Sequence, residues 1–314
     1  MSFDRMEGTR DAYGKTLAQL GHDDPRIVVL TADLAGSTKT ALFGAEHPDR
    51  FFNMGVAEAN MIGTAAGLAM SGYRPFVSTF AVFATGRVWE QVRQVVAYPN
   101  TPVRIAATHA GLTVGEDGAS HQMLEDISNM RVLPNMRVIV PADAVEAAAA
   151  TRFAAANDDG PIYIRLARAA FPVIHDEPFS FELGKAEVLT EGTDVTIVAC
   201  GLMVSVALEA HERLAASGIS SEVINASSIK PFDAETIIAS ASKTGAVVTA
   251  EEHQIAGGLG SSVCEVLSER APTRVVRVGV DDRFGQSGTA DALLSHYGLD
   301  ADGLVAAANH ALAD

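Results

Sequence analysis

Cysteine, basic residues and long apolar runs are all scarce in this 314-residue chain. Its two cysteines, Cys200 and Cys264, are too few for a disulfide framework, so we expect small core residues in a reducing compartment such as the cytoplasm. We find no apolar run resembling a signal peptide at the start, and no later run approaches the ~18 residues of a membrane span. The formal charge of −16 disfavours nucleic acid and anionic membranes as partners. An anionic substrate would therefore need a few arginines to concentrate positive charge locally.

Short β-rich runs alternate with alanine-rich helical runs along the first half of the chain. Their near-continuous apolar character suits a parallel sheet that is covered on both faces, so we predict a doubly wound α/β domain. The predicted strands are 26–34, 74–80, 103–109, 137–143 and 161–168. The predicted helices are 58–71, 85–97 and 144–156.

A polar, proline-containing stretch then interrupts the alternation and predicts a linker at 173–187. It separates a first domain, 1–172, from a second, smaller α/β domain, 188–314. The length of the chain also favours two domains with separate cores. The predicted strands of the second domain are 194–201, 220–229, 246–253 and 273–280.

Several residues that could bind a ligand stand where predicted strands of the first domain end. They are Asp33, Phe80, His109, Asp143 and Arg168. In open α/β sheets, ligands bind at the edge formed by the carboxyl ends of the strands. The sequence therefore predicts a binding site at this edge.

The segment NMGVAEANMIGTAAGLAMSG (53–72) places one acidic residue, Glu58, at the start of a helix of small and apolar residues. We expect its carboxylate to be partly buried. One interpretation is an acid favoured by the helix dipole in the first turn. The other is a carboxylate in a poor solvent that shares a proton with a ligand nitrogen.

The segment THAGLTVGEDGASHQMLED (108–126) contains two histidines, His109 and His121, around a glycine-rich stretch. Glycines allow the sharp turns that would bring both imidazoles and Asp117 towards one point. Imidazoles beside a hydroxylated substrate can exchange protons near neutral pH. A metal site and a loop held by hydrogen bonds are the alternatives, although the spacing fits no common zinc motif.

The pairing of GVAEANMIGTAAGLA (55–69) with ATHAGLTVGEDGASHQ (107–122) resembles the pyrimidine-binding domain of transketolases. The resemblance runs from about Thr9 through the linker. It continues more weakly through the second domain, which is similar to the carboxyl-terminal domain of that family. It implies a thiamine diphosphate-dependent enzyme that transfers a two-carbon ketol group from a ketose phosphate to an aldose phosphate.

The resemblance also implies roles for residues that match the motifs of the family. Glu58 would contact the aminopyrimidine nitrogen of thiamine diphosphate and control its tautomer, which is the protein's contribution to a reaction carried by the cofactor. Phe80 and Phe83 would form the aromatic pocket for the pyrimidine ring. The third pocket aromatic of the family is either replaced by Gly86 or displaced by a short gap, so this wall of the pocket differs. Two core aromatics are the alternative reading of the phenylalanines.

The resemblance implies that His109, His121 and the loop between them bind the substrate. The resemblance implies that His109 faces the reacting carbonyl or its hydroxyl, and that Asp117 and His121 bond substrate hydroxyls. His109 and His121 would thus be catalytic together with Glu58. Asp33 matches a family aspartate near the cofactor and the substrate entrance.

The phosphate groups would be held by Ser37, Arg10 and Arg168, which match phosphate-contacting positions of the family. A guanidinium fork suits a phosphate dianion. A surface salt bridge is the alternative for each arginine. Arg168 departs from the family pattern because Ala167 and Ala169 flank it.

One family motif is absent from the sequence. Related enzymes hold the diphosphate through a metal at a Gly-Asp-Gly motif with an asparagine downstream, and neither EDGAS (116–120) nor NDDGP (157–161) fits it. We therefore expect no metal site in this chain. We expect an amino-terminal transketolase subunit to supply the Mg²⁺ and diphosphate site, with the cofactor across the interface and the assembly a symmetric pair of heterodimers.

Three other identities stay open at this point. The beta subunit of a 2-oxoacid dehydrogenase shares the two-domain plan and the glutamate but needs no paired histidines. Deoxyxylulose-phosphate synthase is a relative that carries both halves on one chain. A non-catalytic regulatory or ligand-binding homologue is the alternative of another class, although Glu58 and both histidines are retained.

The second domain contains one further glycine-rich segment, EEHQIAGGLGSS (251–262), before a predicted helix. Anion binding at the helix terminus is one interpretation. Tight packing of the turn against its strand is the interpretation we favour, because no GxGxxG fingerprint is present. We assign no catalytic role to His253.

Overall fold

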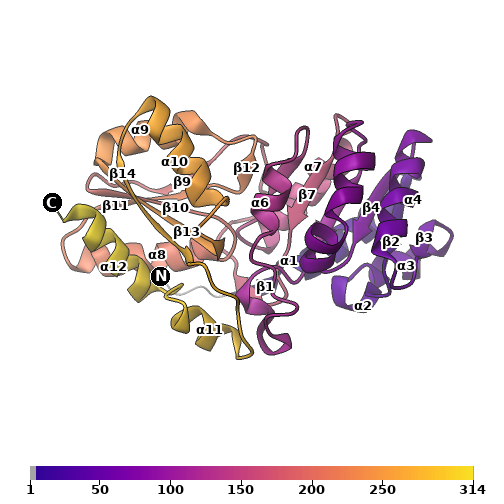
Figure 1. Ribbon diagram of the computed structural model, residues 1–314, viewed down its shortest axis with the longest axis horizontal. Coiled ribbons are helices and arrows are strands. Elements are labelled where there is room, and N and C mark those ends of the chain that lie inside the picture. Colours follow the sequence, from indigo (N-terminus) through magenta and orange to yellow (C-terminus); the bar gives the residue numbers. More distant parts are fainter. Residues whose placement is uncertain (1–4, 314) are drawn as a thin grey trace.

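The computed structural model describes residues 5–313 and comprises two α/β units that lie side by side (Figure 1). The strands are β1 (Met6–Gly8), β2 (Ile27–Thr31), β3 (Phe51–Asn53), β4 (Arg74–Ser78), β5 (Arg104–Ala107), β6 (Arg137–Ile139), β7 (Ile162–Arg165), β8 (Ala170–Pro172), β9 (Glu187–Thr190), β10 (Val195–Ala199), β11 (Ser221–Asn225), β12 (Ser228–Lys230), β13 (Ala246–Gln254) and β14 (Arg274–Val280). The α-helices are α1 (Thr9–Asp23), α2 (Ala35–Thr38), α3 (Ala41–Glu46), α4 (Glu58–Met70), α5 (Trp89–Gln91), α6 (Asp126–Arg131), α7 (Ala144–Ala156), α8 (Met203–Ala216), α9 (Ala234–Thr244), α10 (Leu259–Arg270), α11 (Ala290–His296) and α12 (Ala301–Leu312). Short 3₁₀ segments are η1 (Pro48–Arg50) and η4 (Leu112–Asp117), and π-helical segments are η2 (Val82–Arg87) and η3 (Val92–Ala97).

Two mainly parallel sheets confirm the predicted fold class. The first has the strand order β12-β6-β7-β5-β4-β2-β3 and the second the order β14-β13-β10-β11-β9. Helices α9 and α10 cover one side of the second sheet, and α8 and α12 cover the other (Figure 1). The sequence pattern missed the antiparallel edge strand β9, and it merged β11 and β12 into one predicted strand, 220–229, which the structure divides in two. It also missed that β12, which follows β11 in the chain, joins the sheet of the first unit.

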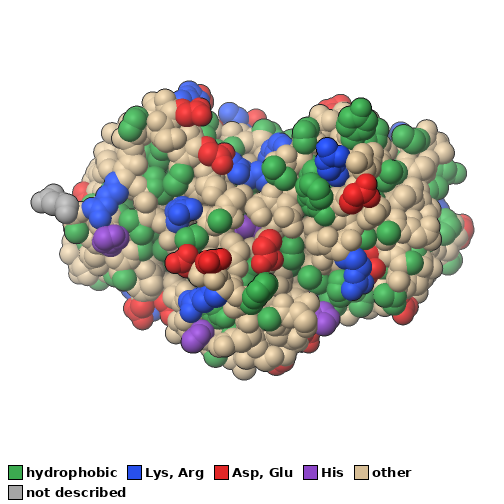
Figure 2. Space-filling view, in the orientation of Figure 1, with side chains coloured by type: hydrophobic (Ala, Val, Ile, Leu, Met, Phe, Trp, Pro, Cys, Tyr) green, Lys and Arg blue, Asp and Glu red, His purple; other side chains and the backbone are tan. Residues whose placement is uncertain are grey.

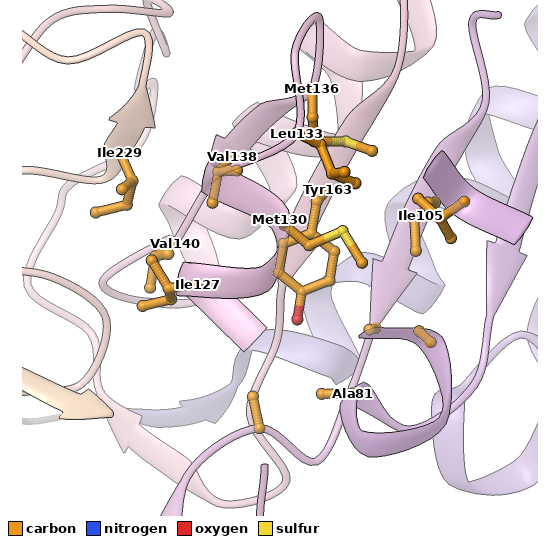
Figure 3. Packing of buried hydrophobic residues seen from close by; sticks show 14 of the residues in the cluster. Ala81, Ile105, Ile127, Met130, Leu133, Met136, Val138, Val140, Tyr163 and Ile229 are labelled. Carbon is orange, nitrogen blue, oxygen red and sulfur yellow. The ribbon is translucent and has the colours of Figure 1, made fainter. Parts of the chain in front are cut away.

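Strand β12, from the second half of the chain, packs into the hydrophobic core of the first unit. Ile229 of β12 is 1% exposed and belongs to the same buried cluster as Val138 and Val140. Figure 3 shows these three side chains beside one another, with Ile127 and Met130 of α6 next to them. Because burying each aliphatic side chain stabilises the fold by roughly 1.5–3 kcal/mol, this seam joins the two units firmly.

Local sequence explains where the helices begin. The Asp143 carboxylate accepts a hydrogen bond from the Glu146 N–H (2.8 Å) and thereby caps α7. The predicted helix 85–97 is present but irregular, because π-helical turns precede and follow the short α5. π-Helical turns are often found at functional sites.

Residues 173–186, which lie within the predicted linker, contain no helix or strand. Asp143 anchors their start, because its second carboxylate oxygen accepts bonds from the backbone N–H groups of Ile174 and His175 (both 2.8 Å). Burial alone would lower the pKa of His175, but hydrogen bonds to Asp143 and Glu187 raise it to about 10. Asp143 therefore serves the structure.

The surface and the cysteines agree with the composition. Acidic and basic side chains are interspersed on the face shown in Figure 2. Cys200 is buried and Cys264 half-buried, and both are free thiols, as predicted. Between residues 5 and 313, no helix combines the length and the apolar character needed to cross a membrane.

Candidate active site

The sheet edge at which the sequence predicts a binding site is formed in the first sheet. Strands β7, β5, β4 and β2 are neighbours and parallel, so their carboxyl ends lie along one edge. Arg168, His109, Phe80 and Asp33 follow these strands in that order. A parallel bridge between Phe80 and Thr108 extends the pairing of β4 and β5 to this edge.

Four rings meet at the centre of the edge. Phe80 stacks on His109 with ring centroids 3.7 Å apart, and it lies nearly parallel to Phe83 at 5.9 Å. His121 approaches both phenylalanines edge-on, at 6.2 and 5.9 Å. The glycine-rich segment therefore brings both histidines to one point, as the sequence predicts.

His109 is held neutral in this cluster. Its side chain is buried, with Nδ1 in a 2.8 Å hydrogen bond with Thr108 Oγ1. Burial, followed by the positive charges of Arg10 and Arg168, lowers the pKa of His109 to about 3. The backbone φ of 60° at His109 is uncommon for a residue with a side chain and fits a functional position.

Glu58 is the first residue of α4 and only 3% exposed, as expected from the sequence. Arg87 Nη1 donates to both of its carboxylate oxygens, each at 3.1 Å. The same guanidinium lies 4.3 Å from the centre of the Phe83 ring and thus joins Glu58 to the aromatic cluster.

Sequence reasoning missed Arg87 entirely. It ends the π-helical segment η2, and its side chain is 51% exposed. The available signal was its position four residues after Phe83, on the same irregular helical stretch.

Three predicted residues lie at the rim of the site. The Asp33 N–H donates to Asn53 Oδ1, and Asn53 Nδ2 donates to Asp33 Oδ1, both at 3.0 Å, so β3 holds Asp33 in place. Asp33 is exposed, with a φ of 61°. Arg10 Nη1 donates to the backbone carbonyl of Ser37 (2.9 Å), which pairs two predicted phosphate-binding residues through the main chain.

The second predicted arginine is docked on the loop between the histidines. Arg168 Nη1 donates to the Val114 carbonyl (2.8 Å) and to Glu116 (3.0 Å). Asp117 is the exposed last residue of η4 on the same loop, four residues before His121. We call residues 110–122 the histidine loop.

Within residues 5–313, one cluster of histidine and acidic side chains could hold a metal ion, and it lies outside this site. His22, Glu46 and His47 have potential ligand atoms close together. Both nitrogens of His47 are occupied, however: Nε2 bonds the Ala18 carbonyl and Nδ1 accepts from Arg50. This donor set therefore suits a protein hydrogen-bond cluster rather than a metal ion.

The glycine-rich turn of the second domain also uses its polar groups internally. The Glu251 carboxylate accepts from the N–H groups of Leu259 (2.7 Å) and Gly260 (2.8 Å), so a protein acid occupies the amino terminus of α10. A Cβ at Gly258 would lie 2.0 Å from Glu251 Oε2. The close packing of this turn is confirmed. His253 is fully buried beside it.

The geometry at the sheet edge suits a flat heteroaromatic ring with a nitrogen that can be protonated. Glu58 offers a buried carboxylate, Phe80 and Phe83 offer aromatic faces, and His109 adds an uncharged imidazole. Nearby Arg10 and Arg168 supply positive charge in an acidic chain, which suits an anionic group on a second ligand.

Two family models match the chain. The model of the transketolase pyrimidine binding domain covers residues 6–173, and that of the transketolase C-terminal domain covers residues 184–304.

Three similar proteins match along nearly their full length. The chain is 50% identical to a putative transketolase C-terminal section of Methanocaldococcus jannaschii, over 95% of this chain and 94% of that protein. It is 46% identical to a 6-deoxy-6-sulfo-D-fructose transketolase subunit of Clostridium sp., over 96% and 93%. A solved structure described as a split gene transketolase, inactive beta4 tetramer, is 55% identical and superposes with a TM-score of 0.91 over 97% of this chain and 98% of that chain.

Proposed function

The chain belongs to the transketolase family, and we propose that it is one subunit of a two-chain transketolase. The complex would transfer a two-carbon ketol group from a ketose phosphate to an aldose phosphate. One observation carries this proposal: the buried Glu58 carboxylate is linked through Arg87 to the ring cluster of Phe80, Phe83, His109 and His121.

Thiamine diphosphate, when bound, would supply the nucleophilic carbon for this reaction. Glu58 would hold a proton together with a pyrimidine nitrogen, and burial favours such sharing because a carboxylate is poorly solvated there. Phe80 and Phe83 would contact the pyrimidine ring. Asp33 would lie near the cofactor at the rim.

Arg87 must leave or share Glu58 for this contact to form. It occupies both carboxylate oxygens, but half of its side chain is exposed. Because the Arg87 guanidinium can turn into solvent, a ligand nitrogen can compete with it for the buried Glu58 carboxylate. We propose that Arg87 acts as a placeholder that satisfies Glu58 until the cofactor arrives.

His109 would bind the reacting sugar as a neutral hydrogen-bonding group, and His121 would exchange protons with it. Because the pKa of His109 is lowered to about 3, the imidazole stays neutral at physiological pH and can both donate and accept hydrogen bonds. With Nδ1 bonded to Thr108, its hydrogen bond to a substrate would use Nε2. Asp117 and His121 would read the hydroxyl groups, which is how a polyol site rejects analogues that lack them.

The sugar phosphate would be bound by Arg10, Arg168 and Ser37. The two arginines are close enough for both charges to depress the pKa of His109. In a chain with a formal charge of −16, this local positive field would select an anionic group. To bind the phosphate, Arg168 would have to give up its ion pair with the exposed Glu116.

A partner chain would complete the site. The sequence lacks the metal-binding motif for a diphosphate, and the similar proteins are described as a C-terminal section, a subunit and a split gene product. We propose that an amino-terminal subunit holds Mg²⁺ and the diphosphate, and that two heterodimers pair symmetrically in the cytoplasm. The similar solved structure is described as an inactive beta4 tetramer, and this description supports a need for the partner chain.

The test is to mix the purified chain with the candidate amino-terminal subunit, thiamine diphosphate and Mg²⁺, and to measure ketol transfer from xylulose 5-phosphate to ribose 5-phosphate. We expect transfer only from the mixture. Decarboxylation of a 2-oxoacid instead would identify a dehydrogenase beta subunit. A complex that binds the cofactor but transforms no ketose phosphate or 2-oxoacid would favour the non-catalytic alternative.

A further inference from the structure

The histidine loop rests on the second domain as well as on the sheet that carries the ring cluster. Figure 1 shows helix α11 close to the first unit, and η4 of the histidine loop packs against it. The loop carries Asp117 and His121. Contacts from the second domain can therefore set where these two side chains stand.

One contact is made by a buried acid of β13. Glu252 is 4% exposed, and its Oε1 accepts a hydrogen bond from the Thr113 N–H at 2.5 Å. Burial raises the pKa of Glu252 to about 7. Burying a carboxyl group costs free energy of folding, and the hydrogen bond from the loop backbone to Glu252 offsets this cost.

The strand that carries Glu252 is itself fixed to the first sheet. Arg165 of β7 donates to the Glu252 carbonyl (2.9 Å) and to the Asp126 carboxylate (2.7 Å). Tyr163 also donates to Asp126 (2.7 Å). The position of Glu252 is therefore set by a buried network that links both units.

A second contact is made through Gln122 at the end of the loop. Its Nε2 donates to the carbonyls of Leu112 (3.1 Å), Gly115 (3.3 Å) and Gln286 (2.9 Å). The first two lie within the loop and the third in the second domain. Gly285 allows this approach, because a Cβ there would lie 1.9 Å from Gln122 Oε1.

The three glycines of the loop all face the second domain. A Cβ at Gly111 would lie 2.2 Å from Glu252 Cδ, and one at Gly118 would lie 2.5 Å from Ser287 Oγ. At Gly115 the nearest atom would be the Gly288 carbonyl oxygen, at 3.3 Å. All three have positive φ, between 75° and 85°. The glycine pattern thus fits the loop to the second domain as well as allowing its turns.

We propose that the second domain is the template for the histidine loop, with Glu252 and Gln122 as positioning residues for Asp117 and His121. The inference rests on the proposed function, because it assigns these two side chains to sugar hydroxyls. A displacement of about 1 Å can cost on the order of 10²-fold in activity, so such support matters even though neither positioning residue touches a substrate. Glu58, Phe80 and Phe83 all lie outside the histidine loop, so cofactor binding should be much less sensitive to the position of the loop than sugar binding.

The experiment has one arm that needs no partner chain. In the isolated chain, hydrogen exchange of the histidine-loop amides is compared between wild type and Glu252→Ala. We expect exchange at Thr113 to accelerate by about 10- to 100-fold, the equilibrium factor for losing one hydrogen bond to a charged group. Glu222→Ala is the matched control, because Glu222 is a buried acid of the same domain that pairs with Lys243 instead.

The second arm measures kinetics in the reconstituted complex. Glu252→Ala should raise the KM for xylulose 5-phosphate by about tenfold or more while the Kd for thiamine diphosphate stays within about twofold. Glu252→Gln keeps an oxygen that can accept from Thr113, so it should recover most of the loss. Gly285→Ala should give the same pattern through Gln122 if Glu252→Ala does not fold.

The outcomes separate the two claims. Unchanged loop exchange, or equal losses for the sugar and the cofactor, would overturn the positioning role. A wild-type complex without ketol transfer would remove the proposed function, yet the exchange arm would still decide whether the second domain holds the loop.

Discussion

Replacing Glu58 with glutamine removes the proton-sharing group while keeping its shape. We expect turnover of the reconstituted complex to fall by about 10²- to 10⁴-fold, the usual contribution of a positioned acid–base group. Ketol transfer from xylulose 5-phosphate is the assay, with thiamine diphosphate at saturation. Loss of turnover at saturating cofactor would separate catalysis from binding.

The same change should leave the fold and the assembly intact. Arg87 is the charged partner of Glu58, and 51% of its side chain is exposed, so it can be solvated once Glu58 loses its charge, and we expect a loss on the order of 1 kcal/mol. Glutamine still offers Arg87 one acceptor oxygen. We therefore expect the Tm to change by no more than about 2–4 °C.

Glu90→Gln is the matched control, because Glu90 is an exposed acid on the neighbouring helix α5. It removes the same charge and should leave turnover unchanged. Near-normal turnover in Glu58→Gln would remove the mechanistic assignment. A large fall in Tm or loss of the complex would show that Glu58 serves the structure instead.

Three further predictions concern the cofactor, a histidine and the core. The isolated chain should bind thiamine diphosphate poorly if, as we propose, the partner subunit carries the diphosphate site, and tight binding by calorimetry without a partner would refute this. The pKa of His109 is lowered to about 3, so the stability that the neutral imidazole contributes to the fold is present above pH 6.5 and is lost as the pH falls towards 3. NMR should show a neutral His109 ring at pH 5, and a titration midpoint near 6.5 would contradict its burial. Asp126→Ala leaves Arg165 and Tyr163 without their buried partner and should lower the free energy of unfolding in urea by about 3–5 kcal/mol, whereas a loss below about 1 kcal/mol would contradict a stabilising network.

Much of the sheet and the centre of the site could be predicted because the signals are local. Apolar runs place β2, β4, β5 and β7, and parallel strands necessarily bring the residues after them to one edge. Glu58 stands out as an acid among small residues, and this isolation predicts its burial. The paired histidines are separated by glycines, and the structure does bring their rings to the same phenylalanines.

Contacts between distant segments could not be predicted. Nothing near Glu252 in the sequence indicates that its carboxylate meets the backbone of Thr113, 139 positions away. Arg87 resembles any exposed arginine until the fold places Glu58 beside it. The short strand β12 gives no sign of leaving its own domain, because its pairing with β6 depends on how the two units pack.

Side-chain and backbone roles also differ from what residue types suggest. Ser37 was singled out for phosphate binding, but its carbonyl, which any residue would offer, receives the bond from Arg10. Asp143 stands at a strand end like the other candidates, yet capping α7 and anchoring the linker consume its carboxylate. Position along the chain alone cannot separate these uses, because both place a polar group after a strand.

The most direct measurement is a structure of this chain assembled with its amino-terminal partner and thiamine diphosphate. We predict a Glu58 carboxylate oxygen within hydrogen-bond distance, about 2.6–3.2 Å, of a pyrimidine nitrogen, with Arg87 displaced and the diphosphate on the other chain. A cofactor bound away from the subunit boundary, or a Glu58 still paired with Arg87 and out of reach of the pyrimidine, would contradict the account.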